Sequence, residues 1–497
     1  MKNTILISLI ITGIFYRSSV AQTVHELDLN QSLAIAMEKS YKMLVLIENL
    51  NSAEYTLKAA TNRFKTSIDL KIKAPNYTET IRAFEDSLGV YYSPIKQANY
   101  QSDLSISQPL PTDGHLYFST GFYNLEDYDK KRQTIQLNSR IGFEQPLEAF
   151  YSFSNIKVSL RQAELNYEMS KKQLLRSELD LKYEVGQSFY YLVSMIEREK
   201  IARQTLAYQQ ETFELAQNKY KAGVIAEVEA LQMEVDLGEA LNNHDISRSN
   251  RQSQEDAFKQ LLGLPLADSL IIYSELEYIP IEVDVKQAVE LGLKNRLEIR
   301  ENEISTELAE IDIRRKRLNG QITGSITAYY DFIGVGENDR EILLSTTFQN
   351  AMSEFKNRPG NKGISLTVSI PLWDWGVTKA QVQASRANLR KAQYTLENEK
   401  ISVERDVRET VNQLKSSLRR LQLLEKNIMV AEKSFEISKQ RFSNGDINSQ
   451  SLALDRNRLS QAHVSRLEAY ISYKLLLADL TRKTFYDFET DRPVFNQ

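Results

Sequence analysis

The residue types that carry out chemistry in enzymes are few in this chain and do not cluster. The four histidines, at positions 25, 115, 244 and 463, are scattered, and none belongs to a His-Glu-x-x-His metal site. Cysteine is absent, which excludes disulfides, thiolate zinc sites, iron–sulfur clusters and thiol catalysis. Gly334-Val-Gly336 lacks the third glycine of a nucleotide-binding loop, and no Gly-x-Ser-x-Gly motif occurs. The sequence therefore predicts that the protein is not an enzyme and has no cofactor or metal.

The composition favours long helices and excludes one class of partner. The 497 residues include only 18 Gly and 10 Pro, well below the usual shares of these residues, so a chain of many short loops is not expected. The 62 Lys+Arg nearly balance the 66 Asp+Glu, and the net charge is -4. A nucleic-acid-binding protein carries a basic surface, so no nucleic-acid partner is predicted.

The N-terminus is typical of an exported protein. Lys2 is followed by an apolar stretch from Ile5 to Tyr16 and by the small-x-small cleavage pattern Ser19-Val20-Ala21. We therefore interpret residues 1–21 as a signal peptide, with a buried N-terminal helix as the alternative. No later stretch reaches 18 consecutive apolar residues, so any insertion into a membrane is expected to use β-structure.

An internal duplication organises the rest of the chain. Glu26-Leu-Asp-Leu-Asn-Gln-Ser-Leu33 matches Glu282-Val-Asp-Val-Lys-Gln-Ala-Val289, and Gln-Pro-Leu at 145–147 is repeated as Ile-Pro-Leu at 370–372. Tyr220 and Gly223 correspond to Phe442 and Gly445. These landmarks occur in the same order, and they predict two structural repeats, residues 22–280 and 281–497. Each repeat is expected to contain a helix, a β region and a long helical hairpin, followed in the second repeat by a C-terminal tail.

The two longest predicted helices cover about 154–220 and 378–442. Neither range contains proline, and in the second one Val403, Val407 and Val411 begin an apolar stripe at helical spacing. At 1.5 Å per residue, about 65 residues form a helix of roughly 100 Å. Such helices must pack along equally long partners, so a coiled-coil sheet or barrel is predicted.

The β regions alternate apolar residues with Ser, Thr and Gln, as a barrel wall between lipid and water requires. Alternation also fits a half-buried strand of a soluble sheet. The main strands are predicted at about 114–126, 134–147, 319–332 and 361–371, with external loops at 127–133 and 333–360. Residues 66–74 and 99–110 predict two further strands, in the barrel or beside it. Flanking aromatic residues are expected to form an interfacial girdle: Tyr117, Phe118, Phe122, Tyr123, Tyr329, Tyr330, Phe332, Trp373 and Trp375.

Taken together, these motifs resemble the TolC-like outer-membrane efflux proteins. The resemblance covers essentially the whole chain after residue 21 and includes Ile370-Pro-Leu-Trp-Asp-Trp-Gly376 and Leu261-Leu-Gly-Leu-Pro265. It implies a mainly α protein with β-structure, located in the outer membrane, whose helices form an α-barrel in the periplasm. Each chain of a homotrimer would contribute four strands to one 12-stranded β-barrel. The implied function is passive conduction from a periplasmic adaptor and an inner-membrane pump, in a tripartite efflux or type I secretion system.

The same resemblance assigns adaptor docking and the periplasmic entrance to the tips of the helical hairpins. The corresponding residues here are Tyr220, Lys221, Ala222, Gly223, Val224, Arg441, Phe442, Ser443, Asn444, Gly445 and Asp446. The Arg and the two Asp that narrow the entrance of the best-known member are not matched, because Ile447, Ser451 and Leu454 occupy their positions. Asp446 and Asp455 would give a shifted ring, but a helix cap or a solvated surface charge is the favoured interpretation of each.

A structural coiled-coil protein, either a periplasmic adaptor or a spacer, is the alternative function. An adaptor has one helical hairpin inserted into Gly-rich β domains. Two copies, each with a barrel-type hairpin, favour the channel.

Overall fold

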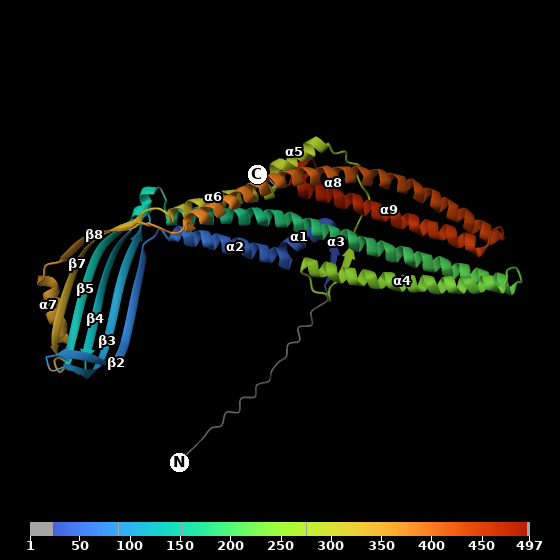
Figure 1. Ribbon diagram of the computed structural model, residues 1–497. Coiled ribbons are helices and arrows are strands. Elements are labelled where there is room, and N and C mark those ends of the chain that lie inside the picture. The colour runs from blue at the N-terminus through green and yellow to red at the C-terminus, as the bar shows by residue number, and fades with distance from the viewer. Residues whose placement is uncertain (1–22, 88, 152, 275, 495–497) are drawn as a thin grey trace, which may run out of the picture. The chain divides into compact units, whose positions relative to one another are not determined.

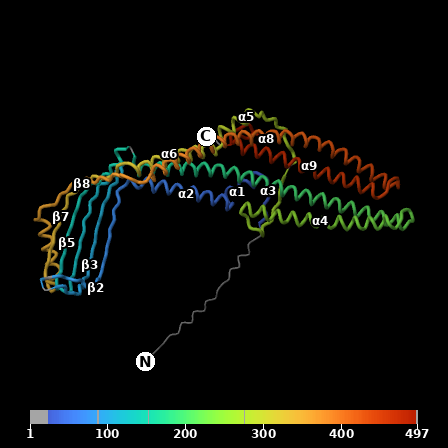
Figure 2. The backbone as a smooth tube through the Cα atoms, in the orientation of Figure 1, coloured from blue at the N-terminus to red at the C-terminus, as the bar shows by residue number. Residues whose placement is uncertain are grey.

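The computed structural model describes residues 23–494 except 88, 152 and 275, so the predicted signal peptide lies outside the described residues. The chain forms two compact units that exchange segments (Figure 1). One unit combines residues up to 46 with 177–295 and 403 onward; the other combines 47–176 with 296–402. Because the long helices run from one unit into the other, the units do not coincide with the two sequence repeats. Figure 2 traces the path of the chain through both.

The two longest helices match the sequence prediction. Helix α3 spans Asn155–Lys221 and helix α8 spans Val377–Asn444. Each is followed, after a tight turn, by a shorter antiparallel partner: α4 (Glu227–Leu262) and α9 (Ser449–Thr484). Among the residues that the structure describes, no helix combines the length and the apolar character needed to cross a membrane.

The first unit is helical, with two small sheets. Besides α4, α9 and parts of α3 and α8, it contains α1 (Leu29–Lys39) and α5 (Val285–Asn295). The strands β1 (Val24–Leu27) and β6 (Ser269–Ile272) pair in parallel, and β9 (Tyr486–Asp487) pairs with β10 (Arg492–Pro493).

The duplicated motif begins a helix in both repeats, as predicted. Asp28 accepts a hydrogen bond from the backbone N–H of Gln31 at 2.7 Å, and Asp284 accepts one from Gln287 at 3.2 Å. A carboxylate in this position satisfies a backbone donor that has no partner inside the helix. The two copies therefore use the same cap to begin α1 and α5.

The apolar stripe of α8 forms the core of the first unit. Val403, Val407 and Val411 are completely buried. The backbone of Gly292 in α5 lies so close to them that an added Cβ would be 3.0 Å from a methyl group of Val407. Tyr470 of α9 is also buried, and this burial raises its pKa to about 12. Because this face of α8 packs in the core, its apolar residues recur without interruption at spacings of three and four.

The second unit contains one antiparallel sheet in the order β2-β3-β4-β5-β7-β8. The strands are β2 (Ser67–Asp86), β3 (Gly89–Pro109), β4 (His115–Asp127), β5 (Arg132–Pro146), β7 (Thr323–Asp339) and β8 (Asn361–Ser369). The four main predicted strands correspond to β4, β5, β7 and β8.

Two sequence expectations about this sheet need correction. The sheet has six strands instead of the four that the family resemblance implies, because β3 pairs with β4 from Gln97 to Pro109 and so joins β2 to the sheet. The span 333–360 is not simply a loop. Strand β7 continues to Asp339, and residues Leu344–Asn357 form the amphipathic helix α7.

Helical segments at one end of the sheet complete the second unit. They are most of α2 (Tyr41–Asn62), the short η1 (Leu147–Tyr151), α6 (Leu297–Leu318) and the first turns of α3 and α8. Arg300 of α6 binds Glu168 of α3 through two hydrogen bonds, of 2.8 and 3.2 Å. The hydrogen bonds from Arg300 hold the pKa of Glu168 below its usual value. Ser385 of α8 donates to Asp312 of α6 at 2.6 Å, so polar contacts join three helices.

Candidate functional site

The tips of the two helical hairpins have the same backbone geometry. In the first tip, Gly223 N–H donates to the Tyr220 carbonyl at 2.8 Å and Val224 N–H to the Lys219 carbonyl at 2.9 Å. In the second, Gly445 N–H donates to Phe442 at 3.1 Å and Asp446 N–H to Arg441 at 2.9 Å. This pair of bonds defines a Schellman cap, and it satisfies carbonyls that the helix leaves without partners.

Glycine is required at both tips by the backbone conformation. Gly223 has φ +72° and Gly445 has φ +86°, in the left-handed region that side chains with a Cβ disfavour. No atom lies within 4 Å of an added Cβ at either position, so the requirement comes from the backbone angle and not from crowding. Both tips therefore end in a small, exposed reversal of the chain.

Side-chain contacts hold the two tips together within the first unit. The Lys219 ammonium donates to the Phe442 carbonyl oxygen at 2.8 Å and lies 4.7 Å from the centroid of the Phe442 ring. Phe442, Phe435 and Leu452 form a buried cluster, and Leu215 of α3 packs against it. Tyr208 of α3 meets the ring of Phe435 edge-on at 5.7 Å. The hairpin α3–α4 is thus anchored to the hairpin α8–α9 near their ends.

The predicted tip residues differ sharply in exposure although they correspond in sequence. Tyr220 is 42% exposed, whereas Phe442 is only 4% exposed. Of the other predicted residues, Lys221, Gly223, Arg441, Asn444, Gly445 and Asp446 are all exposed. Phe442 therefore supports the tip from inside, and the remaining set forms its surface. The repeat alignment pairs these two aromatic residues but contains no signal that separates their roles.

The two carboxylates near the second tip, Asp446 and Asp455, differ in their side-chain contacts. Asp455 accepts a hydrogen bond from Ser438 at 2.5 Å and forms an ion pair with Arg458 at 3.1 Å. Asp446 lies in the turn and is exposed. Asp455 is thus part of the contact between α8 and α9, which leaves Asp446 as the exposed member of the pair.

The sheet has one apolar face across all six strands. The register places Leu70 opposite Leu104, Ile106 opposite Phe118, and Ile141 opposite Tyr330, all on the same face. Residues at alternate positions continue this face: Ile68, Ile72, Leu116, Phe122, Leu137, Phe143, Ile326, Phe332, Ile364, Leu366 and Val368. Many of these side chains are exposed, although they are large and apolar. A shallow hollow of about 640 Å³ lies in it between Leu116, Phe143 and Ile364.

The opposite face of the sheet is polar. Ser105, Ser119 and Arg140 lie on it in adjacent strands, and Arg140 binds Asp331 of β7 at 2.6 Å. Asp331 also accepts a hydrogen bond from Asn361 of β8 at 2.9 Å. On this face Arg140 and Asp331 therefore form an ion pair between neighbouring strands.

The predicted aromatic girdle is not a single ring. Tyr117 and Tyr329 lie on the polar face, each with its ring over a glycine of the next strand, Gly142 and Gly363 respectively. These two tyrosines therefore do not share a face with Phe122 and Phe332.

Phe122 and Phe332 lie on the apolar face but meet another element. Helix α7 packs there, with Phe348 6.5 Å from Phe122 and Phe355 6.0 Å from Phe332, measured between ring centroids. Its backbone lies directly against Gly334, where an added Cβ would be 2.1 Å from the Ala351 carbonyl oxygen. Helix α7 therefore covers this face toward the end of the sheet far from α3 and α8.

The tryptophans lie at the other end of the sheet. Trp373 and Trp375 follow β8, are 75% and 88% exposed, and meet edge-on at 5.5 Å. In the first repeat, Phe150 follows β5 and is 76% exposed, although it is not among the predicted girdle residues. Its position after the duplicated Pro-Leu is the signal that relates it to the tryptophans. Exposed aromatic residues thus mark this end of the sheet in both repeats.

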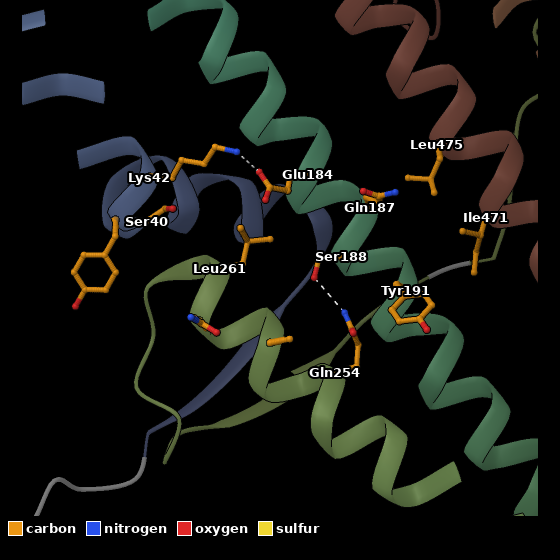
Figure 3. A pocket seen from close by; sticks show the side chains of 13 residues that line it. Ser40, Lys42, Glu184, Gln187, Ser188, Tyr191, Gln254, Leu261, Ile471 and Leu475 are labelled. Atoms are coloured by element: carbon orange, nitrogen blue, oxygen red, sulfur yellow. Dashed lines mark hydrogen bonds and ion pairs between the residues drawn. The ribbon is translucent and has the colours of Figure 1, made fainter. Parts of the chain in front are cut away.

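A hollow of about 720 Å³ lies in the helical unit, between α3, α4, α9 and the start of α2 (Figure 3). Lys42 forms an ion pair with Glu184, and Gln254 donates to Ser188 at 3.2 Å. These two contacts connect α2 with α3 and α4 with α3 at the edge of the hollow.

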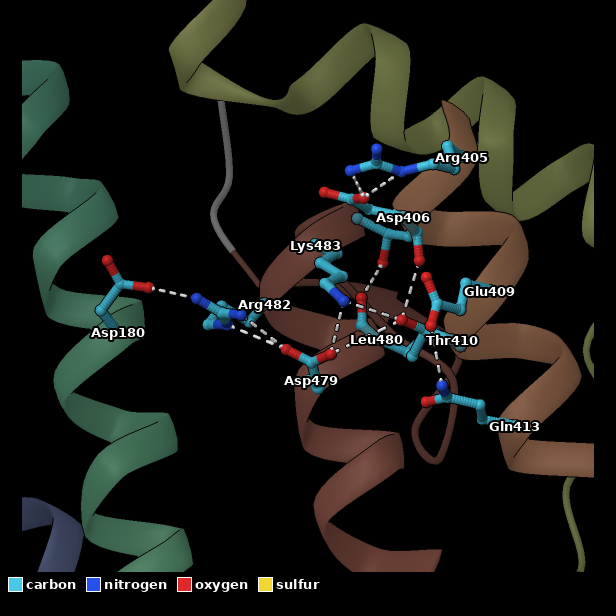
Figure 4. A network of polar contacts seen from close by, with 11 residues as sticks. Asp180, Arg405, Asp406, Glu409, Thr410, Gln413, Asp479, Leu480, Arg482 and Lys483 are labelled. Atoms are coloured by element: carbon cyan, nitrogen blue, oxygen red, sulfur yellow. Dashed lines mark hydrogen bonds and ion pairs between the residues drawn. The ribbon is translucent and has the colours of Figure 1, made fainter. Parts of the chain in front are cut away.

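In the same unit, a network of charged side chains joins the three long helices α3, α8 and α9 (Figure 4). Arg482 of α9 contacts Asp180 of α3 at 2.8 Å and Asp479 at 2.7 Å. Lys483 binds Asp479 at 2.7 Å and donates to Thr410 of α8 at 2.8 Å. Burial alone lowers the pKa of Arg482, but the hydrogen bonds from Arg482 to both carboxylates raise it above its ordinary value. The network links the walls of the helical unit.

The described residues contain no group of three or more His, Asp or Glu side chains arranged to hold a metal ion. The chain's distinctive surfaces are instead the two-faced sheet and the paired tips. The sheet can separate an apolar from a polar environment, and the exposed tips can contact another protein.

Comparisons with known proteins identify a matching family model and several solved structures of similar fold. The model of the family described as "Outer membrane efflux protein" matches residues 95–264 and 289–482. No curated protein sequence matches the chain. The CmeC outer membrane channel of Campylobacter jejuni has a similar structure, with 15% identity, coverage of 94% of this chain and 87% of that one, and a TM-score of 0.68. The Vibrio cholerae outer membrane protein VceC gives 14% identity, coverage of 92% and 95%, and a TM-score of 0.65. The open state of the Neisseria gonorrhoeae MtrE outer membrane channel gives 15%, coverage of 92% and 88%, and 0.64.

Proposed function

This chain belongs to the outer membrane efflux protein family, and we propose that it is the passive exit duct of a tripartite efflux or type I secretion system. The observation that supports this function best is the combination of a two-faced sheet with paired long helical hairpins in one chain. The sheet is the outer-membrane part and the helices are the periplasmic part. Solutes pass through without chemistry, driven by an inner-membrane pump.

The two faces of the sheet fit a wall between lipid and water. Exposed Ile, Leu and Phe side chains on one face are stable against lipid, and the paired charges and hydroxyls on the other face meet a water-filled lumen. An open sheet leaves unpaired backbone groups at its edges, which lipid cannot satisfy. Copies of the chain therefore share one barrel, and following the family resemblance we propose a homotrimer.

Exposed apolar stripes on the helices support the same assembly. Along the first tip and α4, Val224, Val228, Leu231 and Val235 are each more than half exposed and recur at spacings of four and three. On α8, Leu423, Val430 and Ile437 recur every seven residues, and all are exposed. Stripes at these spacings pack into neighbouring helices. Their partners are the helices of adjacent copies, which together close an α-barrel.

The tips are the docking surface for a periplasmic adaptor protein. Tyr220, Lys221, Arg441, Asn444 and Asp446 form an exposed surface on two rigid turns. Phe442 and the contact from Lys219 hold the two turns side by side, so one adaptor surface engages both repeats. The adaptor connects the duct to its pump. A periplasmic adaptor or spacer function for the chain itself is not favoured, because the family consists of outer-membrane channels.

Membrane extraction tests the channel function. The full-length protein, expressed in a Gram-negative host, is expected in the outer-membrane fraction and to run as a trimer in detergent that becomes monomeric on heating. Recovery in the soluble periplasmic fraction, or a monomer regardless of heating, would contradict the proposal.

Charge reversal tests the docking surface. Lys221→Glu and Arg441→Glu are expected to weaken binding of the cognate adaptor about tenfold each, without loss of the trimer, because both side chains are exposed at the tips. Lys200→Glu is the matched control, since Lys200 is an exposed residue of α3 away from the tip. Equal affinity of all three variants would argue against docking at the tips.

A further inference from the structure

The edge of strand β4 that a four-strand unit would use for assembly is already occupied. Strand β3 pairs with β4 continuously, from Gln97 opposite Asp127 to Pro109 opposite His115. Strand β2 then pairs with β3. In the part of the chain that the structure describes, the outer strands of the sheet are therefore β2 and β8, at opposite edges in Figure 1.

The hairpin of β2 and β3 has the same facing pattern as the rest of the sheet. Ile68 lies opposite Ile106, and Leu70 lies opposite Leu104, on the apolar face. Ile68, Leu70 and Ile72 are 60 to 69% exposed. Asp69 and Lys71 point to the polar face, opposite Ser105 and Asp103. A hairpin lying beside the wall, in water, would gain nothing from three exposed branched apolar residues, whereas one in the wall places them in lipid.

Strand β2 has 20 residues, but its first, regularly paired part is similar in length to strand β8 and runs in the opposite direction. Strand β8 has nine residues, Asn361–Ser369. Strand β2 pairs regularly from Ser67 to Lys73, and its register then shifts before Asn76. β2 begins at the end of the sheet near the long helices and β8 finishes there, so the two run in opposite directions. An antiparallel pair between them would be similar in length to β8 and would end at the irregularity.

We propose that β2 of one copy pairs with β8 of the next, so that three copies of the six-stranded sheet close a barrel of 18 strands (three times six). This inference rests on the proposed shared barrel and replaces the 12 strands that the family resemblance implies. Barrel diameter grows roughly linearly with strand number, so the wall is about 1.5 times as wide as a 12-stranded one. The partner of each outer strand is therefore a strand of a second copy of this chain.

Disulfide cross-linking tests the pairing, and the chain is suited to it because it has no cysteine. Asp69→Cys is combined with Thr367→Cys, both on the polar face of the outer strands. Companion variants that replace Thr367→Cys by Ser365→Cys or Ser369→Cys sample the register two residues either way. The matched control combines Ser119→Cys of β4 with each of the same three β8 positions, which is the contact a 12-stranded barrel would make. Each variant is oxidised in native outer membranes and examined on non-reducing denaturing gels.

We expect that Asp69→Cys forms covalent dimers and trimers with at least one of the three β8 cysteines, and that Ser119→Cys forms none with any of them. Cross-linking of Ser119→Cys with β8 would overturn it in favour of 12 strands. A heat-sensitive trimer that none of the pairs cross-links would also overturn it, while leaving the channel function standing. Absence of any trimer on unheated gels of the unmodified protein would instead refute the shared barrel itself.

Discussion

The duplicated tips allow one prediction to be developed with an internal control. Tyr220 and Phe442 occupy the same position of the two repeats, but the first is 42% exposed and the second 4%. Phe442→Ala removes a ring from the cluster with Phe435 and Leu452. Truncating a buried Phe costs about 3–5 kcal/mol, part of it from the cavity left behind. Loss of the Lys219 cation over the ring removes about 0.5–1 kcal/mol more.

Tyr220→Ala removes a ring that is 42% exposed. Its half-buried surface contributes about 1 kcal/mol, so the two variants differ by at least about 2 kcal/mol. Each 1.4 kcal/mol is a tenfold change in an equilibrium constant. Local opening of the second tip in Phe442→Ala is therefore expected to increase by a factor of about 100 or more, while that of the first tip in Tyr220→Ala increases by about fivefold.

Amide hydrogen exchange on the detergent-solubilised trimer measures this opening. The N–H groups of Gly445 and Asp446 report on the second tip, and those of Gly223 and Val224 report on the first, because each donates to the cap of its helix. Adaptor affinity is also expected to fall in Tyr220→Ala, although its tip stays largely closed, because the exposed ring belongs to the proposed docking surface. Equal acceleration of exchange in both variants, or none in Phe442→Ala, would refute the different roles that burial assigns to the two rings.

Three further predictions concern the backbone, the sheet and pH. Gly445→Ala is expected to destabilise its tip by roughly 1–2 kcal/mol because of φ +86°, seen as faster protease nicking there, while Gly238→Ala inside α4 stabilises its helix by about 0.5–1 kcal/mol; slower nicking of the first variant would contradict the cap. Gly142→Ala places a Cβ 2.3 Å from the Tyr117 ring, so the trimer should dissociate at a lower temperature in detergent, and adding Tyr117→Ser should restore most of the loss; no rescue would show that the ring is not the obstacle. The pKa of Asp268 is lowered chiefly by its hydrogen bond with the side chain of His25, so the stabilisation of β1 is present above the usual Asp pKa and lost as pH falls through the lower folded value. Asp268→Asn should therefore make residues 23–27 protease-sensitive already at neutral pH, and an unchanged acid-dependence in this variant would count against the contact.

Much of the architecture could be predicted because it repeats along the chain. The Asp28 and Asp284 caps, the two long helices and both glycine turns are local features, and each appears where its pattern indicates. Helical spacing of Val403, Val407 and Val411 predicts the buried stripe for the same reason, since one face of a helix must meet the core. The family assignment from the ordered motifs is confirmed by the match to the outer membrane efflux protein model.

Strand alternation predicted less, because period two shows that a strand has two faces but not which other strands it joins. The hairpin of β2 and β3 was predicted as two strands of unknown place, and only its register with β4 puts it in the sheet. Helix α7 was missed within a span interpreted as a loop. The helix packs against Gly334 and Gly336 of the preceding strand β7, and spacing along the sequence does not show that the chain folds back in this way.

The sequence by itself determined the repeated plan of this protein: where long helices begin and reverse, which faces are apolar, and which family the chain resembles. These properties depend on neighbours within a few residues, so they can be read along one chain. Tertiary structure alone decided that six strands form one sheet, that the Tyr117 ring packs over Gly142 of the neighbouring strand, and that Phe442 is buried where Tyr220 is exposed. Those outcomes depend on which distant segments pack together, and identical local patterns are compatible with either result.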